Sequence, residues 1–398
     1  MKVLSPWLIL YTVFCFIVSN KIEAQKTIDT KIIDSLYSEE HKPYMIFYLD
    51  SSYVICYDIL QQSEIFNGSV EVKRKIDIKV IKYTKKGIPA WEMILDTKFA
   101  DYVVGVVLVD ENKLMVLSES WDDSYKNERK IILTQINHLG QLLYQKEISK
   151  GTPSAILKLE DNGIFIAYSS RAKEPLSSEY NEELFVSKVD LDGKIIWTKP
   201  FGFFSIQAGV LSGGRSFYLK KYSNNKIYFL IKNSDGTPFD YTLSILDVNG
   251  KAIQNRIKIY GYVDDYYLDQ NNNFYTLEQG WRTLINKKRV RTLNYNHYKN
   301  WKNILSVNLG DSMSFISKSV LKLTNDKKLT CCFTADKKLF VKLLSSSKVE
   351  NLFYSADQIH SNCTMFNFNK QITVLSVGTD ETRKMGHGHE LIMYSFSD

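Results

Sequence analysis

The chain has 398 residues, of which 44% are hydrophobic, 13% aromatic and 24% charged, with only 7 Pro and 19 Gly. This composition excludes a collagen, a coiled coil and an intrinsically disordered chain, and the length accommodates two or three ordinary domains or one large all-β domain. The formal net charge of +7 is spread over 51 basic and 44 acidic residues, so it is a mild bias that does not indicate a polyanion-binding protein.

The N-terminus has the three-part plan of a secretory signal peptide. Lys2 supplies a positive start, an uncharged apolar run extends from Trp7 to Ser19, and Ala24 is a small residue before the expected cleavage site. An uncleaved N-terminal anchor is the alternative, but thirteen apolar residues are few for a bilayer. We therefore predict a signal peptide over residues 1–24. We expect the mature chain to lack a transmembrane segment and to be secreted, periplasmic or at the cell surface.

A turn motif recurs along the rest of the chain. It is clearest between Val189 and Trp197, where Asp192-Gly193 separates two segments of alternating apolar residues, a strong hairpin signal. Six further segments align with it, spaced by 47 to 57 residues. Their turn positions are Gly87, Gly140, Gly250, His297, Ser347 and Asp398. A period near 50 with several short strands per unit predicts a β-propeller.

The predicted fold is all-β: a single seven-bladed β-propeller of four-stranded blades over residues 25–398. The last unit stops after its third strand, whereas a surplus strand, Thr27–Leu36, precedes the first unit, which starts near Tyr44. We expect the N-terminal strand to complete the last blade and close the ring. In the third unit we expect the strands at Ser154–Leu159, Ile164–Ser169, Glu183–Val189 and Lys194–Lys199.

Four cysteines follow the predicted signal peptide, and they are too sparse for a disulfide scaffold. One or two disulfide bridges among Cys56, Cys331, Cys332 and Cys363 remain an alternative. Cys331 and Cys332 are adjacent in an apparent strand, so their side chains should point to opposite faces and be buried separately rather than form a vicinal disulfide.

The Gly-x-x-x-Trp step at Gly87/Trp91 and Gly193/Trp197 resembles the repeat of exported quinoprotein-like bacterial propellers, over roughly residues 28–398. The resemblance implies the fold, but one fold carries many functions. Quinone-dependent enzymes of this class typically have eight blades and a docked Trp at most blade junctions. With seven blades and two or three such Trp here, we expect no cofactor, and a quinone-dependent redox enzyme stays an alternative.

The loops between the second and third strands of each blade should share one face of the ring with the connections between blades. Function sits on such loops, and exposed Trp and Arg anchor protein or sugar partners. The predicted binding residues are Trp121, Asp122, Asp123, Arg171, Glu174, Tyr180, Trp281, Arg282 and Arg383. We therefore predict a monomeric binding module for a protein or glycan, and not for nucleic acid. For any one of these residues, an ordinary solvated loop is the structural alternative.

Three chemical alternatives remain open. His387 and His389 are candidate metal ligands, although no third ligand is visible. Asp122 or Asp123 with Glu174 could be the paired acids of a carbohydrate-active enzyme, a glycoside hydrolase or lyase acting in the central mouth. The turn 161–163 could suggest calcium but lacks a full set of oxygen ligands. The short basic runs 73–75 and 286–289 are interpreted as solvated loops.

Overall fold

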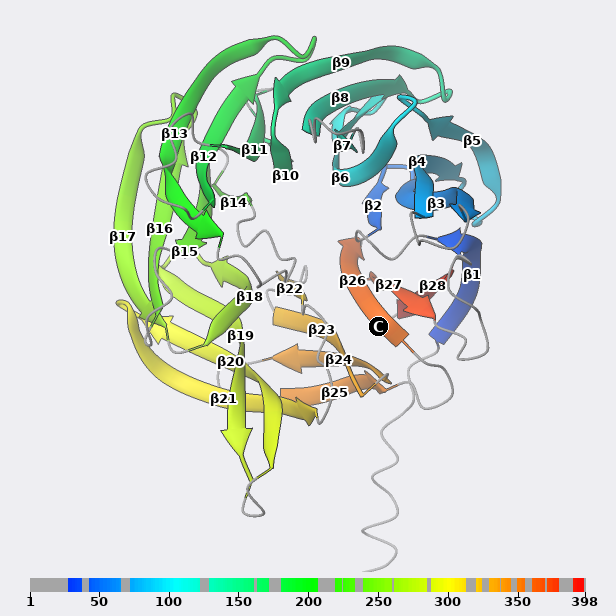
Figure 1. Cartoon of the computed structure of the whole chain (residues 1–398). Coiled ribbons are helices and arrows are strands. Elements are labelled where there is room, and N and C mark those ends of the chain that lie inside the picture. The colour runs from blue at the N-terminus through cyan, green and yellow to red at the C-terminus, as the bar shows by residue number, and fades with distance from the viewer. Residues whose placement is uncertain are drawn as a thin grey trace, which may run out of the picture.

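The computed structural model is a ring of seven blades, each made of four antiparallel strands, as the sequence predicted (Figure 1). Every statement below concerns the residues that the structure describes. These are 28–37, 43–65, 72–121, 129–160, 163–171, 180–206, 219–223, 225–232, 239–259, 261–284, 288–312, 320–323, 329–336, 338–344, 349–354, 360–368, 371–378 and 389–396.

Each blade begins with a strand near the ring centre and proceeds outward (Figure 1). The first strands are β2 (Tyr44–Phe47), β6 (Ala100–Asp110), β10 (Thr152–Lys158), β14 (Lys220–Ser223), β18 (Tyr262–Leu268), β22 (Val320–Leu323) and β26 (His360–Phe368). The second strands are β3 (Tyr53–Ile65), β7 (Lys113–Trp121), β11 (Ile164–Arg171), β15 (Lys226–Lys232), β19 (Asn273–Thr283), β23 (Leu329–Ala335) and β27 (Gln371–Gly378).

The two outer positions complete the blades. The third strands are β4 (Val72–Tyr83), β8 (Arg129–Asn137), β12 (Tyr180–Val189), β16 (Phe239–Asp247), β20 (Arg289–Lys299), β24 (Lys338–Leu344) and β28 (His389–Phe396). The outermost strands are β5 (Pro89–Leu95), β9 (Leu142–Lys150), β13 (Ile195–Ile206), β17 (Ala252–Ile259), β21 (Lys302–Ser312), β25 (Val349–Tyr354) and β1 (Ile28–Tyr37).

The N-terminal strand lies outermost in the blade that holds the C-terminus. β1 pairs antiparallel with β28, from Ile28 opposite Phe396 to Tyr37 opposite His389. Tyr37 also pairs with Ile59 of β3, so the seventh and first blades are continuous in one eight-stranded sheet.

The core is divided among the interfaces between blades. In one cluster, Val107 and Leu133 of the second blade pack with Ile156 and Ile166 of the third. The inner strand β6 is apolar along most of its length and buried on both faces, because blades flank it on both sides. The outermost strand β9 is mostly exposed, which explains its more polar sequence.

At three successive junctions, the aromatic residue four positions after one blade's turn glycine packs on the turn glycine of the next blade. Trp91 of the first blade packs on Gly140 in the turn of the second, and its indole Nε1 donates a hydrogen bond to the His138 carbonyl at 2.9 Å. Gly140 has φ +83°, and a Cβ there would lie 2.8 Å from the Trp91 ring. Glycine is therefore required both for the turn and for the approach of the ring.

The two following junctions use the same arrangement. The Tyr144 hydroxyl donates to the Leu191 carbonyl at 3.2 Å beside Gly193. Trp197 lies against Gly250, where a Cβ would be 3.0 Å from its ring. The sequence period thus reflects a contact between successive blades.

One predicted turn position is wrong. His297 lies inside β20, opposite Leu305, and the turn comes later, at Asn300 and Trp301, which have φ values of 51° and 63°. Asparagine tolerates this left-handed conformation better than most residues, so Asn300 stands where other blades use glycine. The other two inexact copies, Ser347 and Asp398, lie outside the described residues.

The four described cysteines are buried and unbridged. Cys331 and Cys332 pack into different core clusters, which confirms that they point to opposite faces of β23. Cys332 Sγ lies 3.5 Å from Cys363 Sγ of the next blade. Within the described part of the chain, there is no helix with the length and apolar character needed to cross a membrane.

Candidate functional site

Six of the predicted site residues lie on strands rather than in loops. They are Trp121, Arg171, Tyr180, Trp281, Arg282 and His389. The loop boundaries were wrong because the second and third strands continue to pair past the expected loop starts, as Trp121 with Arg129 shows. The other predicted residues, Asp122, Asp123, Glu174, Arg383 and His387, lie outside the described residues, as do the side chains of Arg171, Tyr180 and His389.

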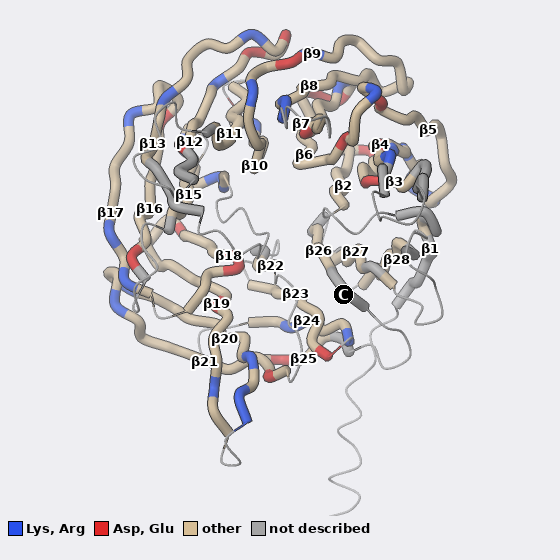
Figure 2. The backbone as a smooth tube through the Cα atoms, in the orientation of Figure 1, with Lys and Arg blue, Asp and Glu red and all other residues tan. Residues whose placement is uncertain are grey.

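The fifth blade carries the ribbon formed by the paired ends of β19 and β20, here called the β19–β20 ribbon (residues 279–284 and 288–293). In Figure 1 this ribbon extends beyond the outline of the ring, and Figure 2 shows Lys and Arg on both of its strands. The Leu284 amide donates to the Lys288 carbonyl at 2.8 Å near its tip. Backbone pairing therefore holds the ribbon in place outside the ring.

Trp281 is the large aromatic residue of this ribbon, and 56% of it is exposed. It stands opposite Arg291 on β20, and the Arg291 guanidinium lies 5.0 Å from the centre of the indole ring. A cation over an aromatic face at this distance is attracted by the ring and fixes its orientation. Arg282, the next residue of β19 after Trp281, forms an ion pair with Asp311 of β21.

The second blade contains the same pair in a more sheltered setting. Trp121 ends β7 opposite Arg129, whose guanidinium also lies 5.0 Å from the indole centre. Arg129 donates to the buried Glu119 carboxylate at 2.9 Å. Trp121 is half-buried, so this pair is part of the ring edge, whereas the Trp281 pair projects from it.

Sequence reasoning found the two tryptophans but missed Arg129 and Arg291. Each arginine stands directly across the hairpin from its tryptophan, eight residues later in one blade and ten in the other. The different loop lengths hide the pairing in the sequence. Only the strand register, which places opposite side chains on one face, could have exposed it.

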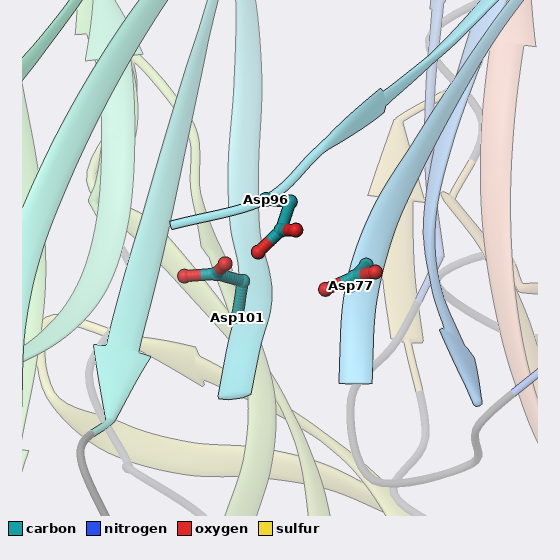
Figure 3. Close-up of side chains that lie close together, drawn as sticks. All are labelled: Asp77, Asp96 and Asp101. Atoms are coloured by element: carbon teal, nitrogen blue, oxygen red, sulfur yellow. The ribbon is translucent and has the colours of Figure 1, made fainter. Parts of the chain in front are cut away.

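Three carboxylates gather where the first and second blades meet (Figure 3). Asp77 lies on β4, Asp96 follows β5, and Asp101 lies on β6. One oxygen of each lies within 4.8 Å of the others. Lys75 reaches Asp96 at 3.0 Å and Asp77 at 3.7 Å, so an ammonium group already balances part of the negative charge.

Asp101 holds the connection between these blades together. Its carboxylate accepts the Thr97 amide at 2.7 Å and the Thr97 hydroxyl at 2.6 Å. The Asp101 residue is only 1% exposed, and burial raises its pKa to about 6 against the opposing effect of these hydrogen bonds. Burial and the Asp96 charge also raise the pKa of Asp77, while the Lys98 amide and Lys75 lower that of Asp96.

These three carboxylates are also the described residues that could hold a metal ion. An all-oxygen set suits a hard cation such as Mg²⁺ or Ca²⁺. However, both Asp101 oxygens already accept hydrogen bonds from Thr97, and Lys75 supplies positive charge. We therefore interpret the cluster as a junction between blades. The predicted metal pair, His387 and His389, has no described side chains.

A hollow of about 350 Å³ lies between the fourth and fifth blades, at the edge of the ring opposite the β19–β20 ribbon. It is lined by residues of the turns and outer strands, including Tyr222, Asn272 and Trp301. The Tyr222 hydroxyl donates to the Asn272 side chain at 3.1 Å, which ties the two blades together. Of the predicted binding residues, the described Trp121, Trp281 and Arg282 are not among those that line this hollow.

No protein-family model matches the chain, and no curated protein matches it. Among solved structures, the polysaccharide lyase Uly1 is similar over 90% of both chains, with 11% identity and a TM-score of 0.55. A puromycin hydrolase is similar over 90% of this chain and 52% of its own, with 8% identity and a TM-score of 0.51.

A puromycin-hydrolysing peptidase of Mycobacterium tuberculosis is similar over 90% of this chain and 53% of its own, with 8% identity and a TM-score of 0.50. This chain thus spans about half the length of these two proteins. At such low identity, the likenesses show the propeller fold alone.

Proposed function

We propose that this chain is an exported, monomeric binding module that recognises a protein or glycan partner. Its binding edge is the edge of the ring where the second and third strands of each blade are joined. Export is supported by the signal-type N-terminus, and membership of the quinoprotein-like propellers is supported by the docking of the repeated aromatics on turn glycines.

One observation carries the proposal. The same tryptophan–arginine pair recurs at this edge in the second and fifth blades, at the same 5.0 Å separation. Trp and Arg dominate binding hot spots because they combine a large apolar surface with directional hydrogen bonding. The opposite edge carries the turns between the third and fourth strands and is here called the turn edge. By contrast with the tryptophan–arginine pairs, the aromatic residues at the turn edge pack on the next blade.

The test compares partner retention by the natural chain and by Trp121→Ala and Trp281→Ala variants. The immobilised protein is offered a panel of polysaccharides and, separately, purified surface proteins of its source cells. Loss of a retained partner in either variant, with unchanged thermal unfolding, supports the proposal. An Ile253→Ala variant on the outer strand of the fourth blade is the control. Equal retention by all variants would contradict the proposed edge.

The second candidate is a carbohydrate-active enzyme, a class to which the structurally similar polysaccharide lyase also belongs. The observation that favours it is the set of neighbouring carboxylates whose pKa values move in opposite directions, raised at Asp101 and lowered at Asp96. Such divergence is typical of paired acid and base groups.

Polysaccharide depolymerisation tests this second candidate. Activity in the natural chain that is lost in Asp96→Asn and Asp101→Asn variants would support an enzyme. If the chain cleaves none of the polysaccharides that it binds, the binding module is the better account.

A further inference from the structure

We infer that one face of the β19–β20 ribbon, formed by Trp281, Arg289 and Arg291, binds a polysaccharide that carries carboxylate groups. This inference rests on the proposed binding function and specifies both its site and its ligand class. The sequence analysis interpreted the basic run 286–289 as a solvated loop, whereas Arg289 is the first residue of β20.

The strand register places these three side chains together. Trp281 stands opposite Arg291, and Thr283 stands opposite Arg289. Opposite residues in an antiparallel pair share a face, as do residues two apart on one strand. Trp281, Arg289 and Arg291 therefore lie on the same face. Arg282, which forms the ion pair with Asp311, lies on the other face.

The chemistry of this face fits an acidic sugar. The indole ring is 56% exposed, and Arg291 at 5.0 Å restricts its orientation. A flat, fixed ring offers an apolar surface to the carbon–hydrogen face of a sugar. Arg289 is exposed and stands roughly 7 Å along the strand from Arg291. Guanidinium groups bind carboxylates through two parallel hydrogen bonds. An acidic sugar could therefore stack its ring on the indole and place its carboxylate against an arginine.

The size of the ribbon favours a glycan over a protein. A stable protein interface needs about 800 Å² on each partner, from roughly 20–30 residues. The described end of the ribbon, Trp281–Leu284 and Lys288–Arg291, has eight residues, and only half of them face one side. One aromatic ring with two arginines suits a few sugar units. Nucleic acid is disfavoured because its affinity comes from many phosphate contacts at once.

Binding of polygalacturonate, measured by calorimetry at low salt, tests the inference. Highly methyl-esterified pectin is the matched ligand, since it keeps the sugar backbone but loses most carboxylate charges. We expect polygalacturonate to bind and the esterified form to bind at least about tenfold more weakly. Added sodium chloride should weaken binding, because exposed charges are screened.

Two variants address the site, and one serves as the control. Trp281→Ala and Arg289→Ala should each weaken binding of polygalacturonate by about tenfold while thermal unfolding stays unchanged. Lys258→Ala removes an exposed cation from the outer strand of the fourth blade and should bind as the natural chain does. Arg289→Ala also keeps the test valid should the Trp281 variant unfold.

Several results would overturn the inference, and they separate it from the proposed function. Equal binding of polygalacturonate by the natural chain and both ribbon variants would exclude this site. Tighter binding of single-stranded DNA, or of esterified pectin, would exclude this ligand class. Retention of a purified protein partner without any polysaccharide binding would overturn the inference alone. Failure to bind any partner would overturn both the inference and the proposed function.

Discussion

Trp91 and Trp281 lie near strand ends at opposite edges of the blades, and their surroundings differ sharply. Trp91 packs on the turn glycine of the next blade and donates a hydrogen bond to its backbone. Trp281 projects on a ribbon beyond the ring, held by an arginine of its own blade. The same residue type therefore joins blades at the turn edge and is available to a partner at the other edge.

This comparison explains why the repeat is visible at one edge only. Docking repeats the same contact at the three junctions from the first blade to the fourth, so glycine and an aromatic recur there at a nearly constant spacing. At the other edge, the described Trp121–Arg129 and Trp281–Arg291 pairs each lie within one blade. The lengths and side chains of the ribbons there can differ, and those differences are where a specific function can arise.

The largest expected effect is at the turn edge, from Gly140→Ala. Position 140 has φ +83°, and the new Cβ would lie 2.8 Å from the Trp91 ring. Backbone strain and loss of the ring contact should together lower the free energy of unfolding by about 2–3 kcal/mol. Denaturant unfolding followed by fluorescence measures this change.

Gly310→Ala is the matched control. A Cβ there would lie 3.6 Å from Phe333, an ordinary contact. The free energy of unfolding should change by less than about 0.5 kcal/mol. If both glycine variants lost the same stability, the turn contact would not be special.

The next effect concerns the junction of the first two blades and depends on pH. The pKa of Asp101 is raised from 3.8 to about 6 in the folded chain, so the folded state binds more protons than the unfolded state between these values. The stabilisation from this group is therefore fully present below about pH 3.8 and is lost as the pH rises through about 6.

An Asp101→Asn variant tests this pH dependence. Relative to the natural chain, it should gain on the order of 2 kcal/mol of stability between pH 4 and pH 7. Urea unfolding at both pH values measures the difference. Parallel stabilities of the two proteins across this range would show that the Asp101 carboxyl titrates normally.

A smaller loss is expected from Trp91→Phe, which keeps an aromatic ring but removes the indole N–H. The hydrogen bond to the His138 carbonyl is then missing, so the free energy of unfolding should fall by about 1 kcal/mol. Thermal unfolding is the measurement. A variant as stable as the natural chain would show that ring packing alone joins these blades.

The smallest effect on stability is expected from Trp281→Ala. The side chain is more than half exposed, and its attraction to Arg291 is worth about 0.5–1 kcal/mol at an exposed site. The thermal midpoint should therefore change little. A loss as large as that of Gly140→Ala would mean that the ribbon is part of the core.

The sequence repeat was sufficient to predict the number of blades and the position of most strands, because a turn glycine with positive φ recurs at Gly87, Gly140, Gly193 and Gly250. It failed at His297, because Asn300 and Trp301 form that turn without glycine. At the other edge, Trp281 could be found as an exposed aromatic candidate. Arg291 could not, since its contact depends on a register that the loop length does not reveal.

The aspartate cluster could not be predicted from the sequence either. Asp77, Asp96 and Asp101 lie on three different segments and meet only when the first two blades pack together. Isolated acidic residues in a sequence are usually solvated, and nothing in their local pattern distinguished these three.

The most direct test of this account measures stability and binding side by side in Trp91→Phe and Trp281→Ala, with polygalacturonate as the ligand. Trp91→Phe should lower stability and keep the natural affinity, whereas Trp281→Ala should keep stability and lose about tenfold in affinity. Unchanged affinity in a folded Trp281→Ala variant would contradict the claim that the β19–β20 ribbon is the binding edge.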